Sequence, residues 1–80
     1  MERLINIGYG NCINSEKVIS VVSADSAPVK RAVQSAKETE RIIDATQGRK
    51  TKSVVFMDSG YIVLSALVPE TIVSRFNGTE

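Results

Sequence analysis

Two apolar runs in the second half of the chain, residues 54–57 (Val-Val-Phe-Met) and 61–64 (Tyr-Ile-Val-Leu), have no polar interruption. A strand with one face in water alternates apolar and polar residues, whereas a continuous run is typical of a strand that is buried on both faces. The sequence Asp58-Ser59-Gly60 between the runs predicts a turn. One amphipathic helix and a short second helix offer little cover for both faces of such a sheet. We therefore expect a neighbouring subunit to cover one face or edge.

The other segments predict a single α+β domain over residues 1–80. Further strands are expected at residues 4–7, 17–22 and 42–46, and the two apolar runs extend to strands at residues 54–58 and 61–68. Apolar residues at helical spacing predict an amphipathic helix over residues 28–40, with Asp25 or Ser26 as its N-cap and Pro28 in its first turn. Pro69 opens a short C-terminal helix. The predicted sheet is small and mainly antiparallel.

Composition favours the association of several copies. A hydrophobic fraction of 42% is enough for a core, but a chain of 80 residues is marginal alone and usually needs disulfides, a metal or oligomerisation. Cys12 is the only cysteine and the chain has no histidine, so an internal disulfide is impossible and a zinc site is not expected. Oligomerisation remains. Because no signal peptide or membrane-spanning segment is visible, we expect a cytoplasmic protein with no membrane partner.

The densest charge follows Gly48, where Arg49, Lys50 and Lys52 place three cations within four residues. The formal net charge of the whole chain is only +1, but residues 30–52 hold seven basic residues against three acidic ones, and seven minus three is +4. Basic residues gathered in one region are the electrostatic footprint of a polyanion binder. The alternative interpretation is a solvated helix followed by a polar turn, with no partner.

The motifs that suggest catalysis are weak. Gly48-Arg49-Lys50-Thr51 resembles the end of a phosphate-binding P-loop, but the first glycine is missing and a strand follows instead of a helix. Gly8-Tyr9-Gly10 begins like a dinucleotide fingerprint but lacks the third glycine, so a turn with positive φ is the simpler interpretation. Cys12 has no histidine as its base, and Asp44 and Asp58 are better explained as turn residues. We expect no catalytic residues, no cofactor, no metal and no small-molecule substrate.

The basic cluster instead favours duplex DNA. Arginine binds phosphate through a planar fork and lysine binds it as a compact point charge. Only 5% of the residues are aromatic and two of these lie in core-like runs, so stacking on single-stranded bases is poorly supported. Three or four cations bind weakly at physiological salt, whereas a closed ring presents the same set many times. The DNA-binding residues expected from this cluster are Arg49, Lys50, Lys52, Lys30 and Arg31.

Three further residues are expected to serve structure or assembly. Gly48 sits in the basic turn, Pro28 sets the start of the helix, and Tyr9 lies between two glycines. Tyr9 either packs on a neighbouring subunit or stacks on a ligand. A different class of function also stays open, in which a ring-forming scaffold uses its basic hairpin to dock acidic protein partners.

Four strings in this chain are specific in combination: Asn6-Ile7-Gly8-Tyr9-Gly10-Asn11, Asp25-Ser26-Ala27-Pro28-Val29-Lys30-Arg31, Asp44-Ala45-Thr46-Gln47-Gly48-Arg49-Lys50-Thr51 and Pro69-Glu70-Thr71. They resemble the RemA family of bacterial regulators, and the resemblance runs from about Leu4 to Arg75. It implies a DNA-binding transcription regulator that activates extracellular matrix genes in biofilm formation. It also implies an octameric ring whose subunit is related to LytTR DNA-binding domains.

The resemblance assigns roles to particular residues. Arg49 and Lys50 match a basic pair implicated in DNA contact, and Pro28 matches the proline that opens the helix. Lys17 matches a basic position in the second strand, so the resemblance adds Lys17 to the expected DNA-binding residues. Lys50 and Lys17 stand where the family more often has arginine. These two positions therefore keep the charge but lose the bidentate fork.

Overall fold

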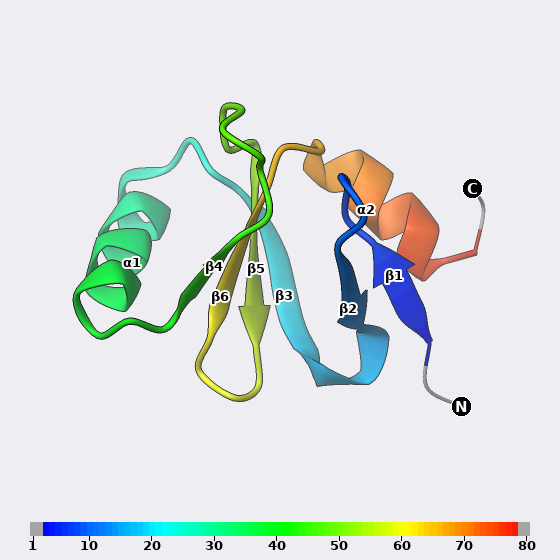
Figure 1. Cartoon of the computed structure of the whole chain (residues 1–80), viewed down its shortest axis with the longest axis horizontal. Helices are drawn as coiled ribbons and strands as arrows, with labels where there is room; N and C mark the ends of the chain where they lie inside the picture. The colour runs from blue at the N-terminus through cyan, green and yellow to red at the C-terminus, as the bar shows by residue number, and fades with distance from the viewer. Residues whose placement is uncertain (1–2, 79–80) are drawn as a thin grey trace.

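The computed structural model describes residues 3–78, which form short strands, two α-helices and one 3₁₀ helix (Figure 1). In chain order the elements are β1 (Leu4–Asn6), β2 (Cys12–Asn14), the 3₁₀ helix η1 (Ser15–Lys17), β3 (Val18–Ser23), α1 (Ala27–Glu38), β4 (Ile42–Asp44), β5 (Ser53–Met57), β6 (Ile62–Ser65) and α2 (Pro69–Phe76). The predicted α+β class and both predicted helices are confirmed. β2 was not predicted from the sequence, and the strands predicted at residues 42–46 and 61–68 are longer than β4 and β6.

The central sheet has the strand order β3-β5-β6-β4. β5 pairs antiparallel with β3 and with β6, which agrees with the predicted mainly antiparallel sheet, but β4 pairs parallel with β6. β6 therefore separates β4 from β5, and residues 45–52 cross the end of β6 to join them. The expectation of a basic hairpin is wrong in this respect, because the basic segment is a crossover connection between strands that do not pair.

Each face of the sheet carries its own layer (Figure 1). On one face α1 packs over a cluster that contains Ala36, Val54, Ile62 and Leu64. On the other face, the β1–β2 hairpin and α2 cover a cluster that includes Val55, Val63 and Ile72 from the sheet and α2, together with Ile5, Ile7 and Ile13 from the hairpin. The predicted two-sided burial of β5 and β6 is confirmed, since Val54 and Val55 are 1% and 0% exposed.

The source of that burial differs from the expectation. A neighbouring subunit was expected to cover one face or edge, but the chain covers both faces of these two strands itself. Cover of an edge strand by a neighbour stays a prediction. The additional cover comes from the β1–β2 hairpin, whose strands pair from Leu4 opposite Asn14 to Asn6 opposite Cys12. Burial of the core therefore gives no reason by itself for the chain to assemble.

The start of α1 agrees with the sequence pattern. Ser26 is the N-cap, and its side-chain oxygen accepts a hydrogen bond from the backbone N–H of Val29 at 3.3 Å. Pro28 lies in the first turn, where the missing N–H has no intrahelical partner to lose. A cap of this kind and the apolar face that includes Ala36 fix where the helix begins and which side faces the sheet.

Two buried serines join the sheet to the second layer. The Ser65 hydroxyl donates to the carbonyl oxygen of Ile7 at 2.8 Å and accepts from the backbone N–H of Leu67 at 3.1 Å. The Ser53 hydroxyl donates to the carbonyl oxygen of Leu67 at 2.5 Å. Both serines are 0% exposed, so these bonds satisfy backbone groups that water does not reach.

We expect Ser65→Ala to lower the free energy of unfolding by about 1–3 kcal/mol, because the two backbone groups bonded to the hydroxyl would lose their buried partner. Urea denaturation followed by circular dichroism measures this change. Ser35→Ala is the control, since Ser35 is exposed on α1 and its replacement should leave stability unchanged or slightly higher. A wild-type denaturation midpoint for Ser65→Ala would contradict the role of the serine.

Candidate functional site

The crossover connection between β4 and β5 begins with a fixed turn. The Asp44 carboxylate accepts hydrogen bonds from the Thr46 backbone N–H at 2.9 Å and from the Thr46 hydroxyl at 2.6 Å. Thr46 itself is only 2% exposed. An aspartate side chain that accepts a hydrogen bond from the backbone two residues ahead commonly stabilises a turn where no strand pairing does so. The expectation that Asp44 acts as a turn residue is confirmed.

Residues 46–49 form a tight turn. The backbone N–H of Arg49 donates to the carbonyl oxygen of Thr46 at 3.0 Å. Gln47 and Gly48 have φ values of 54° and 79°, so both central residues adopt the left-handed conformation of a type I′ turn. Glycine takes this conformation at no steric cost, which explains Gly48 at the second position. The turn therefore holds Arg49 at a defined place at the end of the sheet.

The connection is also fixed where it rejoins the sheet. The Lys52 backbone N–H donates to the Ser65 carbonyl oxygen at 2.9 Å, and the Lys52 carbonyl accepts from the Ala24 N–H at 3.2 Å. The side chains of Arg49, Lys50 and Lys52 are all exposed. Because the backbone is bonded at both ends, three cations project into water from a segment with little freedom to move away.

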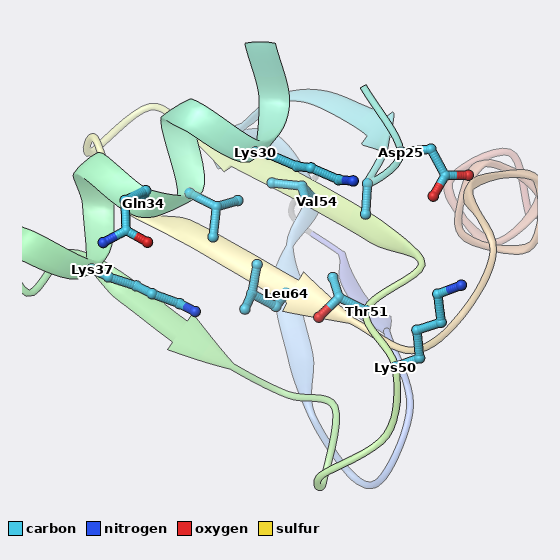
Figure 2. A pocket seen from close by; sticks show the side chains of 10 residues that line it. Asp25, Lys30, Gln34, Lys37, Lys50, Thr51, Val54 and Leu64 are labelled. Atoms are coloured by element: carbon cyan, nitrogen blue, oxygen red, sulfur yellow. The ribbon is translucent and has the colours of Figure 1, made fainter. Parts of the chain in front are cut away.

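A second set of cations faces this segment from α1. Lys30 and Lys37 line a pocket of about 450 Å³ between the helix and the connection, and Lys50 lines the same pocket from the other side. Figure 2 shows Lys30 and Lys37 extending from α1 over the sheet, with Lys50 and Asp25 beyond the far end of the strands. Val54 and Leu64 form the apolar floor. We call this cavity the lysine pocket.

Lys37 also acts on Asp44, the last residue of β4. The pKa of the Asp44 carboxyl lies below its usual value, mainly because the Thr46 hydroxyl and backbone N–H donate to the charged form. Partial burial opposes this shift, and the positive charge of Lys37 adds to it. The carboxylate thus stays charged and keeps the connection bonded near neutral pH.

The predicted DNA-binding residues do not all lie together. Arg49, Lys50 and Lys52 share the connection, and Lys30 meets Lys50 at the lysine pocket. Arg31 is exposed on α1 but does not line that pocket.

Lys17 lies at the opposite end of the sheet. Its carbonyl oxygen accepts from Asp58 N–H at 2.7 Å beside the β5–β6 turn. In the register of β3 and β5, Val18 pairs with Met57, whereas Ser23 pairs with Ser53 next to the connection. Within one chain Lys17 therefore does not belong to the group of cations around the connection.

Lys37 was not among the DNA-binding residues predicted from the sequence. The signal was present, because Lys30, Gln34 and Lys37 recur at i, i+4 and i+7 on one side of α1. What was missing was the place of the helix relative to the connection, which the sequence pattern does not give.

The turn between β1 and β2 has the same geometry as the basic turn. The Asn11 N–H donates to the Gly8 carbonyl at 3.0 Å, and Tyr9 and Gly10 have φ values of 54° and 79°. The expectation of a turn with positive φ is confirmed here. Tyr9 lies at the tip of this turn and is 51% exposed.

The described residues can also be compared with the requirements of a metal-binding cluster and of a helix long enough to span a membrane. Among residues 3–78 no cluster of three or more Cys, Asp or Glu side chains is placed to hold a metal ion. Neither helix described in that range has the length and apolar character that a membrane span requires.

Known proteins resemble nearly the whole chain. Residues 4–76 match the family described as RemA-like, extracellular matrix regulatory protein A-like. A protein of Lachnoclostridium phytofermentans is 58% identical over 80 residues, covering all of this chain and 88% of the relative. Relatives from Geobacillus kaustophilus and Bacillus cytotoxicus are 46% and 51% identical, covering 100% and 98% of this chain and 92% and 90% of their own lengths. All three are named as regulatory proteins.

We expect Asp44→Ala to lower the free energy of unfolding by about 1 kcal/mol near pH 7, because both Thr46 donors lose their acceptor. The folded-state pKa of Asp44 is lowered, so the carboxylate stabilises the fold above its unfolded pKa of about 3.9. That contribution is lost as pH falls through the lower folded pKa. Urea denaturation should therefore show the difference between variant and wild type shrinking from about pH 7 to about pH 3. A difference that is the same at both pH values would contradict this account.

Proposed function

The chain belongs to the RemA-like family of extracellular matrix regulatory proteins, and we propose that it is a transcription regulator that binds duplex DNA. In this proposal it activates extracellular matrix genes of a bacterium that forms biofilms. The contact is made by the basic connection between β4 and β5, which a homo-oligomeric ring displays many times.

The observation that carries this proposal is the presentation of Arg49 and Lys50. Both side chains are exposed at one end of the sheet, on a backbone that is hydrogen-bonded at Thr46 and again at Lys52. A segment whose backbone is already ordered loses little backbone conformational entropy when its cations meet a polyanion. Arginine can bind two phosphate oxygens at once or enter a narrow minor groove, and lysine adds a point charge.

Assembly supplies the affinity that one subunit lacks. A patch of a few cations neutralises few phosphates and binds weakly at physiological salt. Linking several such patches raises their effective concentration for one duplex. Since the core is closed within each chain, the interface between subunits would use apolar side chains outside it. Leu4 and Ile19 are such candidates, at 72% and 69% exposed. An octameric ring is the form we propose, and Pro28 and Tyr9 are further candidates for its contacts.

We expect the double variant Arg49→Ala/Lys50→Ala to lose DNA binding in a gel-shift titration while its mass by light scattering stays that of the wild type. The charge-preserving variant Arg49→Lys/Lys50→Arg is the matched control and should keep most of the binding. Normal DNA binding by the alanine variant would show that this connection is not the site.

The rival function is a ring that docks acidic proteins through the same cations. Capture from a lysate before and after nuclease treatment separates the two functions. Under the DNA proposal the captured material disappears on digestion, whereas acidic protein partners would remain.

Salt provides an independent test. If an assembly engages about 6–10 phosphates, its affinity for duplex DNA should fall by about 10³–10⁵ between about 50 and 200 mM NaCl. Fluorescence anisotropy with a labelled duplex measures this dependence. An affinity that stays constant over that range would contradict a contact dominated by the phosphate backbone.

A further inference from the structure

The lysine pocket carries an excess of positive charge at short range. Its lining includes three cations, Lys30, Lys37 and Lys50, and one carboxylate, Asp25, and three minus one is a net charge of +2. The neighbouring groove next to α2 is lined by Lys50 and Lys52 against Asp25 and Glu70, and two minus two is zero. The lysine pocket is therefore the one of these two hollows that would attract an anion.

The lysine pocket is hollow and partly apolar, unlike a surface that contacts only the DNA backbone. Its volume of about 450 Å³ lies within the range of about 300–1,000 Å³ that small-molecule sites occupy. The floor is apolar, because Val33, Val54 and Leu64 line it, while the Gln34 amide and the Thr51 hydroxyl add neutral polar groups. A duplex phosphate would bind the lysines but leave this floor unused. An apolar floor with cations around it fits an anion that has an organic body.

We propose that the lysine pocket binds a small phosphorylated molecule of mononucleotide size. The phosphate is attracted by the ammonium groups that line the pocket, those of Lys30 and Lys37 from α1 and that of Lys50 from the opposite side, each acting as a point charge. The organic body covers Val54 and Leu64. Asp25 and Gln34 stand at the sides of the pocket, where a carboxylate accepts from hydroxyl or amino groups and an amide both donates and accepts.

Occupation of this site has a consequence for DNA binding, and this step rests on the proposed function. Lys50 lines the lysine pocket and also follows Arg49 in the proposed DNA contact. A phosphate on Lys50 neutralises part of the charge that DNA would use. The bound molecule would therefore weaken DNA binding, which makes it a regulatory ligand of the same surface.

Isothermal titration calorimetry of the assembled wild-type protein tests the site without DNA. The probes are adenosine and guanosine monophosphate, the two unphosphorylated nucleosides, and inorganic phosphate. We expect at least one monophosphate to bind at about one site per chain, and to bind at least about tenfold more tightly than its nucleoside or inorganic phosphate. No binding of either monophosphate at millimolar concentration would overturn the proposal. Equal affinity for inorganic phosphate would also overturn it, because the apolar floor would then contribute nothing.

Two single variants of α1 test whether the monophosphate binds in the lysine pocket. Lys37→Gln should weaken monophosphate binding by roughly tenfold or more, because one charge-assisted contact is lost. Arg31→Gln removes the same charge from an exposed position on the same helix outside the lysine pocket, and should change the affinity by less than about twofold. Both positions are exposed, and circular dichroism checks that both variants fold. Equal losses in the two variants would mean nonspecific attraction and would overturn the site. Since no DNA is present, these results are independent of whether the DNA proposal holds.

Discussion

Burial of β5 and β6 on both faces is the constraint from which the rest of the structure follows. Their apolar runs leave no side of either strand that water can face, so the chain must supply a layer above and a layer below the sheet. α1 forms one layer, and the β1–β2 hairpin with α2 forms the other (Figure 1). Both layers pack on residues of β5 and β6, and the buried hydroxyls of Ser53 and Ser65 also bond the layer that contains the hairpin and α2. The position of α1 beside the basic connection is a consequence of this layering.

The same constraint explains where the charge lies. With β6 paired to both β5 and β4, the segment between β4 and β5 has to cross the end of β6 and cannot lie within the sheet. Cations on that segment cannot be buried without a large desolvation cost, and the crossing keeps them in water. Asp44 and Lys52 fix the two ends of the segment through backbone bonds. Charge that is both exposed and ordered is what a polyanionic partner needs, whether that partner is a duplex or a small phosphate.

Much of this could be predicted from the sequence, for reasons that are local. The continuous runs of β5 and β6, the helical spacing and Ser26 cap of α1, and the glycines of the Gly8–Asn11 and Thr46–Arg49 turns are each encoded in neighbouring residues. β2 was missed because three residues, Cys-Ile-Asn, are too few to show a period. The parallel pairing of β4 with β6 depends on contacts between residues about 20 positions apart, such as Ile42 with Ile62, and no local pattern reports them. Lys37 and the separation of Lys17 from Arg49 were missed for the same reason, since both depend on how the elements pack.

The central claim is that single subunits offer too few cations and that their combined contacts hold DNA. Sedimentation velocity with a fluorescently labelled duplex tests this most directly, because it reports the mass of the free protein and of the complex at the same concentration. The account predicts that the free protein is already an assembly of several chains where half of the duplex is bound, and that the complex contains that assembly. Tight binding by a protein that sediments as a monomer, alone and on the duplex, would contradict it.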